Sequence, residues 1–142
     1  MKKLIYILSL GITLLCADID IMKVSDTLSN IYGVKYYNND KSILLDSTVP
    51  TTTLKKADIV LFPAGLDINK ITIVNSYAKL RLEEKSIGAI YTFKNRTQII
   101  FVRERLKKNS LSLSKELNQY IINECQLNLI CLANHYKIAD VF

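Results

Sequence analysis

The sequence predicts a single α/β domain, a small Rossmann-like sandwich with a mixed sheet. Its 142 residues are 49% apolar and 23% charged, which is the composition of one folded domain. With only four glycines and two prolines, the chain leaves little room for a flexible linker between two domains. The hydrophobic pattern gives strands first and then a β-α-β-β-α order. That order predicts a parallel β-α-β step followed by a C-terminal β-hairpin and a helix.

The N-terminal segment is typical of a secretory signal peptide. A basic start at Lys2 and Lys3 precedes twelve uncharged residues that end at Leu15, and a small residue follows shortly after. Twelve helical residues span about 18 Å, well short of the roughly 30 Å of a bilayer's hydrocarbon core. We therefore expect residues 1–17 to be a signal peptide that directs residues 18–142 to the periplasm.

A lipid anchor on Cys16 is the less favoured alternative. Bacterial lipoproteins are acylated on a cysteine at this position, but the residue before it is normally Gly, Ala or Ser and here is Leu15. Without such an anchor, we expect membrane contact only through a signal peptide that stays uncleaved.

The charge balance suits an acidic partner. Without Lys2 and Lys3, the chain keeps 17 of its 19 basic residues against 13 acidic ones, so its net charge falls from +6 to +4. Moderate basicity in the periplasm fits an acidic protein or an anionic lipid surface. Nucleic acid is not the normal ligand of that compartment, so we do not expect nucleic-acid binding.

The elements before residue 58 are short. The segment 18–31 is compatible with either a short strand or a helix. Further along, we expect a strand at 34–37, a turn at 38–40, a strand at 42–45 and a connection over 46–56.

Residues 58–62 (DIVLF) give the clearest strand, because four apolar residues in succession end at Pro63 and Gly65. Ligands bind at the carboxyl ends of strands in open α/β sheets. Pro63 and Gly65 therefore mark an alternative function, in which the protein is a small-ligand (solute) binding module of the envelope.

A helix is expected next, capped by Asp67 or Asn69 and running to about Lys85. Its apolar residues recur at spacings of three and four, which places them on one helical face. These residues are Ile71, Val74, Ala78 and Leu82. We expect this helix to connect strand 58–62 to the following strand by a right-handed parallel crossover.

A β-hairpin follows, with strands at 86–93 and 98–102 joined by a loop over 94–97. Both faces of each strand carry apolar residues, so both strands are expected to be central in the sheet. After a polar turn or short helix at 103–108, Ser112 or Ser114 is expected to cap a helix through about residue 125. Residues 124–142 form a C-terminal extension.

Cys125 and Cys131 are expected to form a disulfide, because two cysteines in an oxidising compartment pair readily. On one continuous helix they would lie about 9 Å apart along the axis, beyond the roughly 7 Å that a disulfide allows. The helix must therefore break between them, and two buried thiols are the alternative. A metal site is not expected, because His135 is the only further soft ligand and zinc sites use four.

The chain contains no recognisable catalytic or cofactor motif. It has no G-x-S-x-G, H-E-x-x-H, P-loop or G-x-G-x-x-G pattern. The five residues between Cys125 and Cys131 also differ from the C-x-x-C spacing that tunes thiols in oxidoreductases. We therefore favour a non-enzymatic protein without a cofactor, while an enzymatic activity stays open.

Basic residues gather at two ends of the hairpin. One group lies in the 94–97 loop, and the other follows the return strand, so the two groups are expected about 17–20 Å apart. Such a separation does not form the continuous stripe that nucleic acid requires. The second group is a basic edge for contact with an acidic partner: Arg103, Arg105, Lys107 and Lys108.

The stretch from about residue 58 to 117 resembles the YfiR-type periplasmic regulators and their uncharacterised relatives. The resemblance lies in four segments: ADIVLF at 57–62, IGAI at 87–90, IIF at 99–101 and LSLSKEL at 111–117. It implies a small Rossmann-like α/β fold and a periplasmic location. In that family a member restrains an inner-membrane diguanylate cyclase by protein contact. The resemblance thus implies an exported protein that binds a protein partner and regulates an inner-membrane signalling protein.

Overall fold

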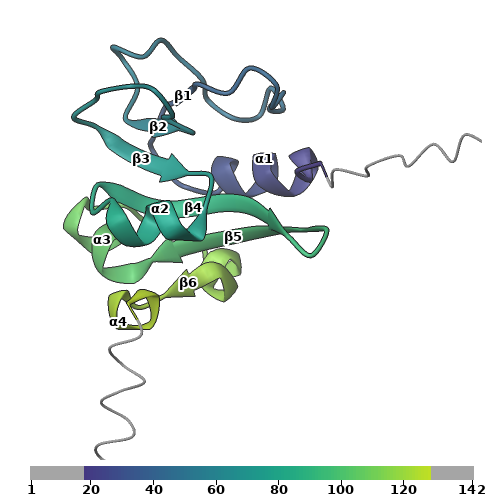
Figure 1. Ribbon diagram of the computed structural model, residues 1–142. Helices are drawn as coiled ribbons and strands as arrows, with labels where there is room; N and C mark the ends of the chain where they lie inside the picture. Colours follow the sequence, from purple (N-terminus) through teal and green to yellow (C-terminus); the bar gives the residue numbers. More distant parts are fainter. Residues whose placement is uncertain (1–17, 129–142) are drawn as a thin grey trace, which may run out of the picture.

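The computed structural model describes residues 18–128, which form one six-stranded mixed sheet with helices on both faces (Figure 1). This confirms the predicted α/β, Rossmann-like fold class. No helix among these residues has the length and apolar content needed to span a bilayer. The elements are α1 (Ile21–Ser29), β1 (Tyr36–Asn38), β2 (Ile59–Leu61), β3 (Ile71–Val74), α2 (Tyr77–Leu82), β4 (Ser86–Phe93), β5 (Arg96–Val102), α3 (Arg103–Lys108), the 3-10 helix η1 (Lys115–Tyr120), β6 (Ile121–Ile122) and α4 (Glu124–Leu127).

Strand order in the sheet follows the sequence, from β1 to β6. The first four strands pair in parallel, β4 and β5 pair antiparallel, and β6 is parallel to β5. Among the described strands the order never reverses, so the sheet lacks the switch-point crevice in which many α/β proteins bind ligands. A binding site must therefore be built in another way.

Two apolar cores lie on opposite faces of the sheet. Side chains alternate along each strand, so neighbours such as Phe101 and Val102 enter different cores. On one face α1 contributes Val24 and Leu28, together with side chains of η1 and α3. On the other face Leu80 of α2 and Leu127 of α4 pack, and both are fully buried. Figure 1 shows α1 and α2 on opposite sides of the strands.

The segment 18–31, left open between strand and helix, forms α1. Asp20 caps the helix, because its carboxylate accepts a hydrogen bond of 3.1 Å from the backbone N–H of Lys23. Two hydrogen bonds tie the same end of α1 to Thr97 in β5. The Asp20 N–H donates to Thr97 Oγ1 at 2.8 Å, and Lys23 Nζ donates to the Thr97 carbonyl at 3.0 Å.

The prediction of one helix from about residue 67 to Lys85 is wrong. Residues 71–74 form β3, and the helix is only α2, which begins after Ser76. All four residues of this segment, ITIV, are β-branched. Such residues favour a strand, and here the strand pairs in parallel with β2 on one side and β4 on the other. Leu82, expected on the buried face, is 83% exposed. The parallel step through a helix is therefore β3-α2-β4.

Other predicted elements differ in extent. Residues 42–45 form no strand, although Ile43 is buried in the core below α1. The hairpin strands 86–93 and 98–102 are confirmed as central, with a loop of only two residues. Ser114 precedes η1 rather than an α-helix, and its side chain makes no capping bond. The chain then enters β6, because Ile121 and Ile122 pair with the end of β5.

Candidate ligand-binding pocket

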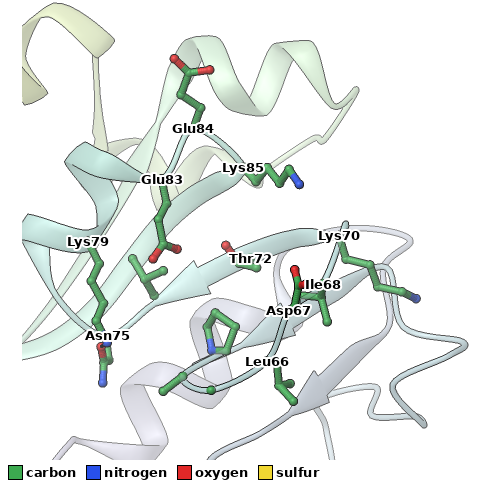
Figure 2. Close-up of a pocket in the computed structure, with 14 residues that line it drawn as sticks. Leu66, Asp67, Ile68, Lys70, Thr72, Asn75, Lys79, Glu83, Glu84 and Lys85 are labelled. Carbon is green, nitrogen blue, oxygen red and sulfur yellow. Dashed lines mark hydrogen bonds between the residues drawn. The ribbon is translucent and has the colours of Figure 1, made fainter.

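A pocket of about 650 Å³ lies over the α2 face of β3. Its floor is β3, one wall is the loop of residues 63–68 between β2 and β3, and the other wall is α2 with residues 83–85 (Figure 2). Pro63 and Gly65, the positions predicted for a strand-end ligand site, both line it.

The 63–68 loop is held firmly where it leaves β2. The backbone of Phe62 is left-handed, with φ of +55°, and its N–H donates 2.8 Å to the carbonyl of Ile73 in β3. Asn39 donates 2.9 Å to the Phe62 carbonyl from the other side. Gly65 has φ of +79°, which glycine adopts without strain, in a turn closed by the bond from Leu66 N–H to the Pro63 carbonyl. Hydrogen bonds therefore hold the start of this pocket wall against β3 and Asn39.

The floor combines apolar surface with a hydroxyl group. Thr72 and Val74 are two residues apart in β3, so both side chains face the pocket, and both residues are buried. Thr72 Oγ1 lies 2.7 Å from Ser86 Oγ in the neighbouring strand. Ser86 is fully buried and does not line the pocket, so the Thr72 hydroxyl in the floor is paired with a hydroxyl beneath it.

Charged side chains of both signs line the pocket. Glu83 and Asp67 point toward the space in front of Thr72 from opposite walls (Figure 2). Lys79 lies at one end, where Nζ donates 3.0 Å to the Asn75 side-chain oxygen. Lys70 is engaged elsewhere, because its Nζ donates to the carbonyls of residues 55 and 57 at 3.0 and 2.7 Å. Glu84 and Lys85 point away from the centre in Figure 2.

Arg105 does not belong to the exposed basic edge that was predicted, because its side chain is buried and the residue is only 6% exposed. Its guanidinium binds Glu124 of α4 through both carboxylate oxygens, at 2.8 and 2.6 Å. The third nitrogen, Nη1, donates to three carbonyls, those of Leu80, Glu83 and Ser86, at 2.8, 3.0 and 2.8 Å. Arg105 therefore holds the end of α2, which is one wall of the pocket.

The other three residues of the predicted edge are exposed on α3. Arg103, Lys107 and Lys108 make no ion pair in the described part of the chain. Lys94 and Arg96 lie at the opposite end of β5 from α3, and Lys94 Nζ is 5.4 Å from the centre of the Phe93 ring. The basic edge thus reduces to these three side chains.

Of the two cysteines in the predicted disulfide, only Cys125 lies within the described residues, which end at position 128. Cys125 lies in α4, which ends at Leu127, between the two cysteines. Cys131 and His135 lie outside the described residues, so the pairing stays a prediction. In residues 18–128 no three His, Cys, Asp or Glu side chains lie close enough to hold a metal ion.

Two tyrosines outside the pocket have raised pKa values. Burial raises the pKa of Tyr36, whose hydroxyl donates 2.9 Å to the Leu28 carbonyl of α1. Burial and the neighbouring phenol of Tyr77 raise the pKa of Tyr91. Neither Tyr36 nor Tyr91 lines the pocket, so neither group gives it acid–base chemistry.

The predictions from sequence missed most of the pocket's polar lining. Asn75, Lys79 and Glu83 were placed on one long helix, which separates them from the 63–68 loop. The β-branched run 71–74 followed by Asn75 and the capping residue Ser76 was the signal that could have revealed them.

No family model, curated protein or solved structure matches the chain.

Proposed function

We propose that this protein is an exported binding protein that holds a small organic ligand in the pocket between α2 and the 63–68 loop. The observation that carries the proposal is the pocket itself, with an apolar floor and polar groups converging from two walls. Its volume of about 650 Å³ falls in the range of roughly 300–1,000 Å³ that small-molecule sites occupy.

Binding without catalysis fits the lining best. Catalysis by a nucleophile needs an exposed hydroxyl or thiol next to a base. Thr72 supplies the hydroxyl nearest the floor, and it is bonded to the buried Ser86 rather than to a base. Glu83 approaches Ser86 only at 3.4 Å, from a side chain that is itself exposed. Among the residues that line the pocket, no nucleophile is therefore paired with a base.

A thermal-shift screen with a metabolite panel tests this proposal. We expect at least one compound to raise the Tm of the purified protein, because a ligand that binds only the folded state stabilises it. Ala64→Trp should abolish that shift, since Ala64 is exposed and lines the pocket, where the indole fills the space. Ala78→Trp is the matched control, because Ala78 is exposed on α2 outside the lining. A panel without any shift, or a shift that survives Ala64→Trp, would overturn the proposal.

A second function, contact with an acidic protein partner, is favoured by the surface next to α3. Arg103, Lys107 and Lys108 are exposed there, and Leu82 is 83% exposed at the end of α2 that Arg105 joins to α3. Exposed cations suit an acidic partner surface, and an exposed apolar side chain can add area to such a contact. In line with the resemblance to YfiR-type regulators, we propose an inner-membrane sensor such as a diguanylate cyclase as this partner.

Cross-linking in cells and recovery from envelope membranes tests the second function. We expect the protein to capture an inner-membrane protein, and charge reversal at Lys107 and Lys108 to glutamate to abolish the capture. Lys55→Glu with Lys56→Glu is the matched control, because it reverses another adjacent and exposed lysine pair. Recovery of no membrane protein, or equal loss in both double variants, would count against the partner surface.

A further inference from the structure

The pocket has an acidic centre. The Glu83 and Asp67 carboxylates point from opposite walls toward the space in front of Thr72 (Figure 2). The only ion pair among the described residues joins Arg105 to Glu124, so neither carboxylate is neutralised by a protein cation. Glu83 accepts one long bond of 3.4 Å, from Ser86. Both groups therefore keep acceptor sites for a ligand that donates hydrogen bonds.

A donor-rich end lies beside this centre, at Lys79 and Asn75. The ammonium group of Lys79 has three donors, and one is engaged with Asn75 Oδ1 at 3.0 Å. Because this bond uses the Asn75 side-chain oxygen, the Asn75 amide nitrogen is a further donor at this end. Lys79 is exposed and makes no ion pair with the described residues. This end therefore suits a ligand carboxylate.

Apolar side chains line the pocket beside these polar groups. Val74 belongs to the floor, and Pro63 and Leu66 belong to the facing wall. A ligand made only of charged groups would leave this surface without a partner. A phosphate would meet two unneutralised carboxylates, which disfavour a second anion.

We infer that the pocket binds a small zwitterion of the α-amino acid class, with its ammonium group at Glu83 and Asp67 and its carboxylate at Lys79 and Asn75. The side chain or carbon frame of the ligand packs on Val74 and Pro63. This inference rests on the proposed small-ligand function and adds the chemical class of the ligand.

Calorimetric titration with three matched sets of probes tests the ligand class. The sets are the standard amino acids, the amines that lack their carboxylate, and the acids that lack their amino group. We expect at least one amino acid to bind and its two analogues to bind about tenfold more weakly or worse, because each loses one charge-assisted contact. An amine or an acid that binds as tightly as its parent amino acid would overturn the inference.

Two substitutions then assign the ends of the pocket. Glu83→Gln should weaken the amino acid and the amine about tenfold while leaving the acid unchanged. Lys79→Met should weaken the amino acid and the acid while leaving the amine unchanged. The matched controls are Glu116→Gln and Lys115→Met, which are exposed on η1 outside the pocket lining and should change none of the affinities. Equal effects of a variant and its control would overturn the assignment.

The metabolite panel separates failure of this inference from failure of the proposed function. If a compound of another class binds and Ala64→Trp abolishes the binding, the pocket is a ligand site but the zwitterion class is wrong. If no compound of any class binds, both are wrong.

Discussion

Arg105 links its own helix α3 to three other elements. Its guanidinium binds the α2 end through the Leu80 and Glu83 carbonyls, the start of β4 through Ser86, and α4 through Glu124. A planar group with five fixed donors can satisfy this arrangement, whereas the single ammonium of a lysine cannot reach all of these acceptors. One side chain thus joins a pocket wall to the C-terminal helix.

Arg105→Met should destabilise the fold by about 3–5 kcal/mol, because it leaves Glu124 and three carbonyls without their common partner. Urea denaturation followed by circular dichroism measures this change. Arg103→Met, two residues earlier on the same helix, is exposed and should alter stability by less than about 0.5 kcal/mol. Similar costs for both variants would contradict the role given to Arg105.

Arg105 also shows what a linear sequence hides. Four basic residues within positions 103–108 predict one basic edge, and three of them are exposed as expected. The short helix α3 directs residues 105 and 106 inward, because they stand where α3 packs against α4 and β4. The burial of Arg105 depends on hydrogen-bond acceptors as far apart in the sequence as Leu80 and Glu124, which no local sequence pattern contains.

Tyr36 is the residue whose titration should be measurable in the stability of the fold. Burial raises its pKa above the ordinary value near 10, so the folded state keeps a proton that the unfolded chain releases in alkali. The stability that this provides is fully present below about pH 10 and is lost as the pH rises toward the folded pKa.

Tyr36→Phe should cost about 1 kcal/mol at neutral pH through loss of the bond to the Leu28 carbonyl. When the pH is raised from about 8 to about 11, the unfolding free energy of Tyr36→Phe should fall by about 1 kcal/mol less than that of the wild type, because the variant has no phenol at position 36 to titrate. Urea titrations at both pH values measure the difference. Tyr32→Phe is the control, because Tyr32 is 60% exposed and should follow the wild type. Parallel alkaline losses for the wild type and Tyr36→Phe would refute the assignment.

Elements were predictable where the local pattern was long. The bounds of β4 match the prediction, because apolar residues recur through most of its eight positions. β5 was predicted from residue 98 rather than 96, because only its last four positions are continuously apolar. The strands β3 and β6 have four and two residues, and their pairing with neighbours decides their conformation. A short apolar run is ambiguous between helix and strand until its neighbours are known. The pocket was only half predicted for the same reason, since β3 is its floor.

The hairpin loop offers a prediction at the scale of the element. Lys94 and Asn95 both have positive φ, of 48° and 60°, as a two-residue type I′ turn requires. Lysine is strained in this conformation, whereas the pair Asn-Gly adopts it readily. Lys94→Asn combined with Asn95→Gly should therefore raise stability by about 1 kcal/mol, measured as a higher urea midpoint with unchanged slope. The same pair of residues introduced at the exposed positions 55 and 56 should bring no such gain. A neutral or lower midpoint would show that the loop is not of this type.

At the scale of the whole molecule, the pocket depends on parts of the chain far from it in sequence. The end of α2 is held by Arg105 of α3, and Arg105 is in turn held by Glu124 of α4. α4 is only four residues long, too short to be stable alone, so its position relies on tertiary contacts such as those of the fully buried Leu127. A covalent link near α4 would therefore stabilise a wall of the pocket at a distance.

The predicted Cys125–Cys131 disulfide would supply such a link. Closing a loop of this size contributes about 2 kcal/mol in the chain-entropy treatment. We expect a reducing agent to lower the Tm of the wild type, and Cys131→Ser to show the lower Tm with or without reductant. Alkylation of the unfolded, unreduced protein followed by mass spectrometry should find Cys125 protected in the wild type and labelled in Cys131→Ser. Cys16→Ser is the control. If Cys125 is bonded to Cys131, Cys125 of this variant stays protected from alkylation and the Tm of the variant still falls with reductant. Labelling of Cys125 in the wild type would refute the disulfide, and protection that Cys16→Ser removes would assign the bond to Cys16 instead.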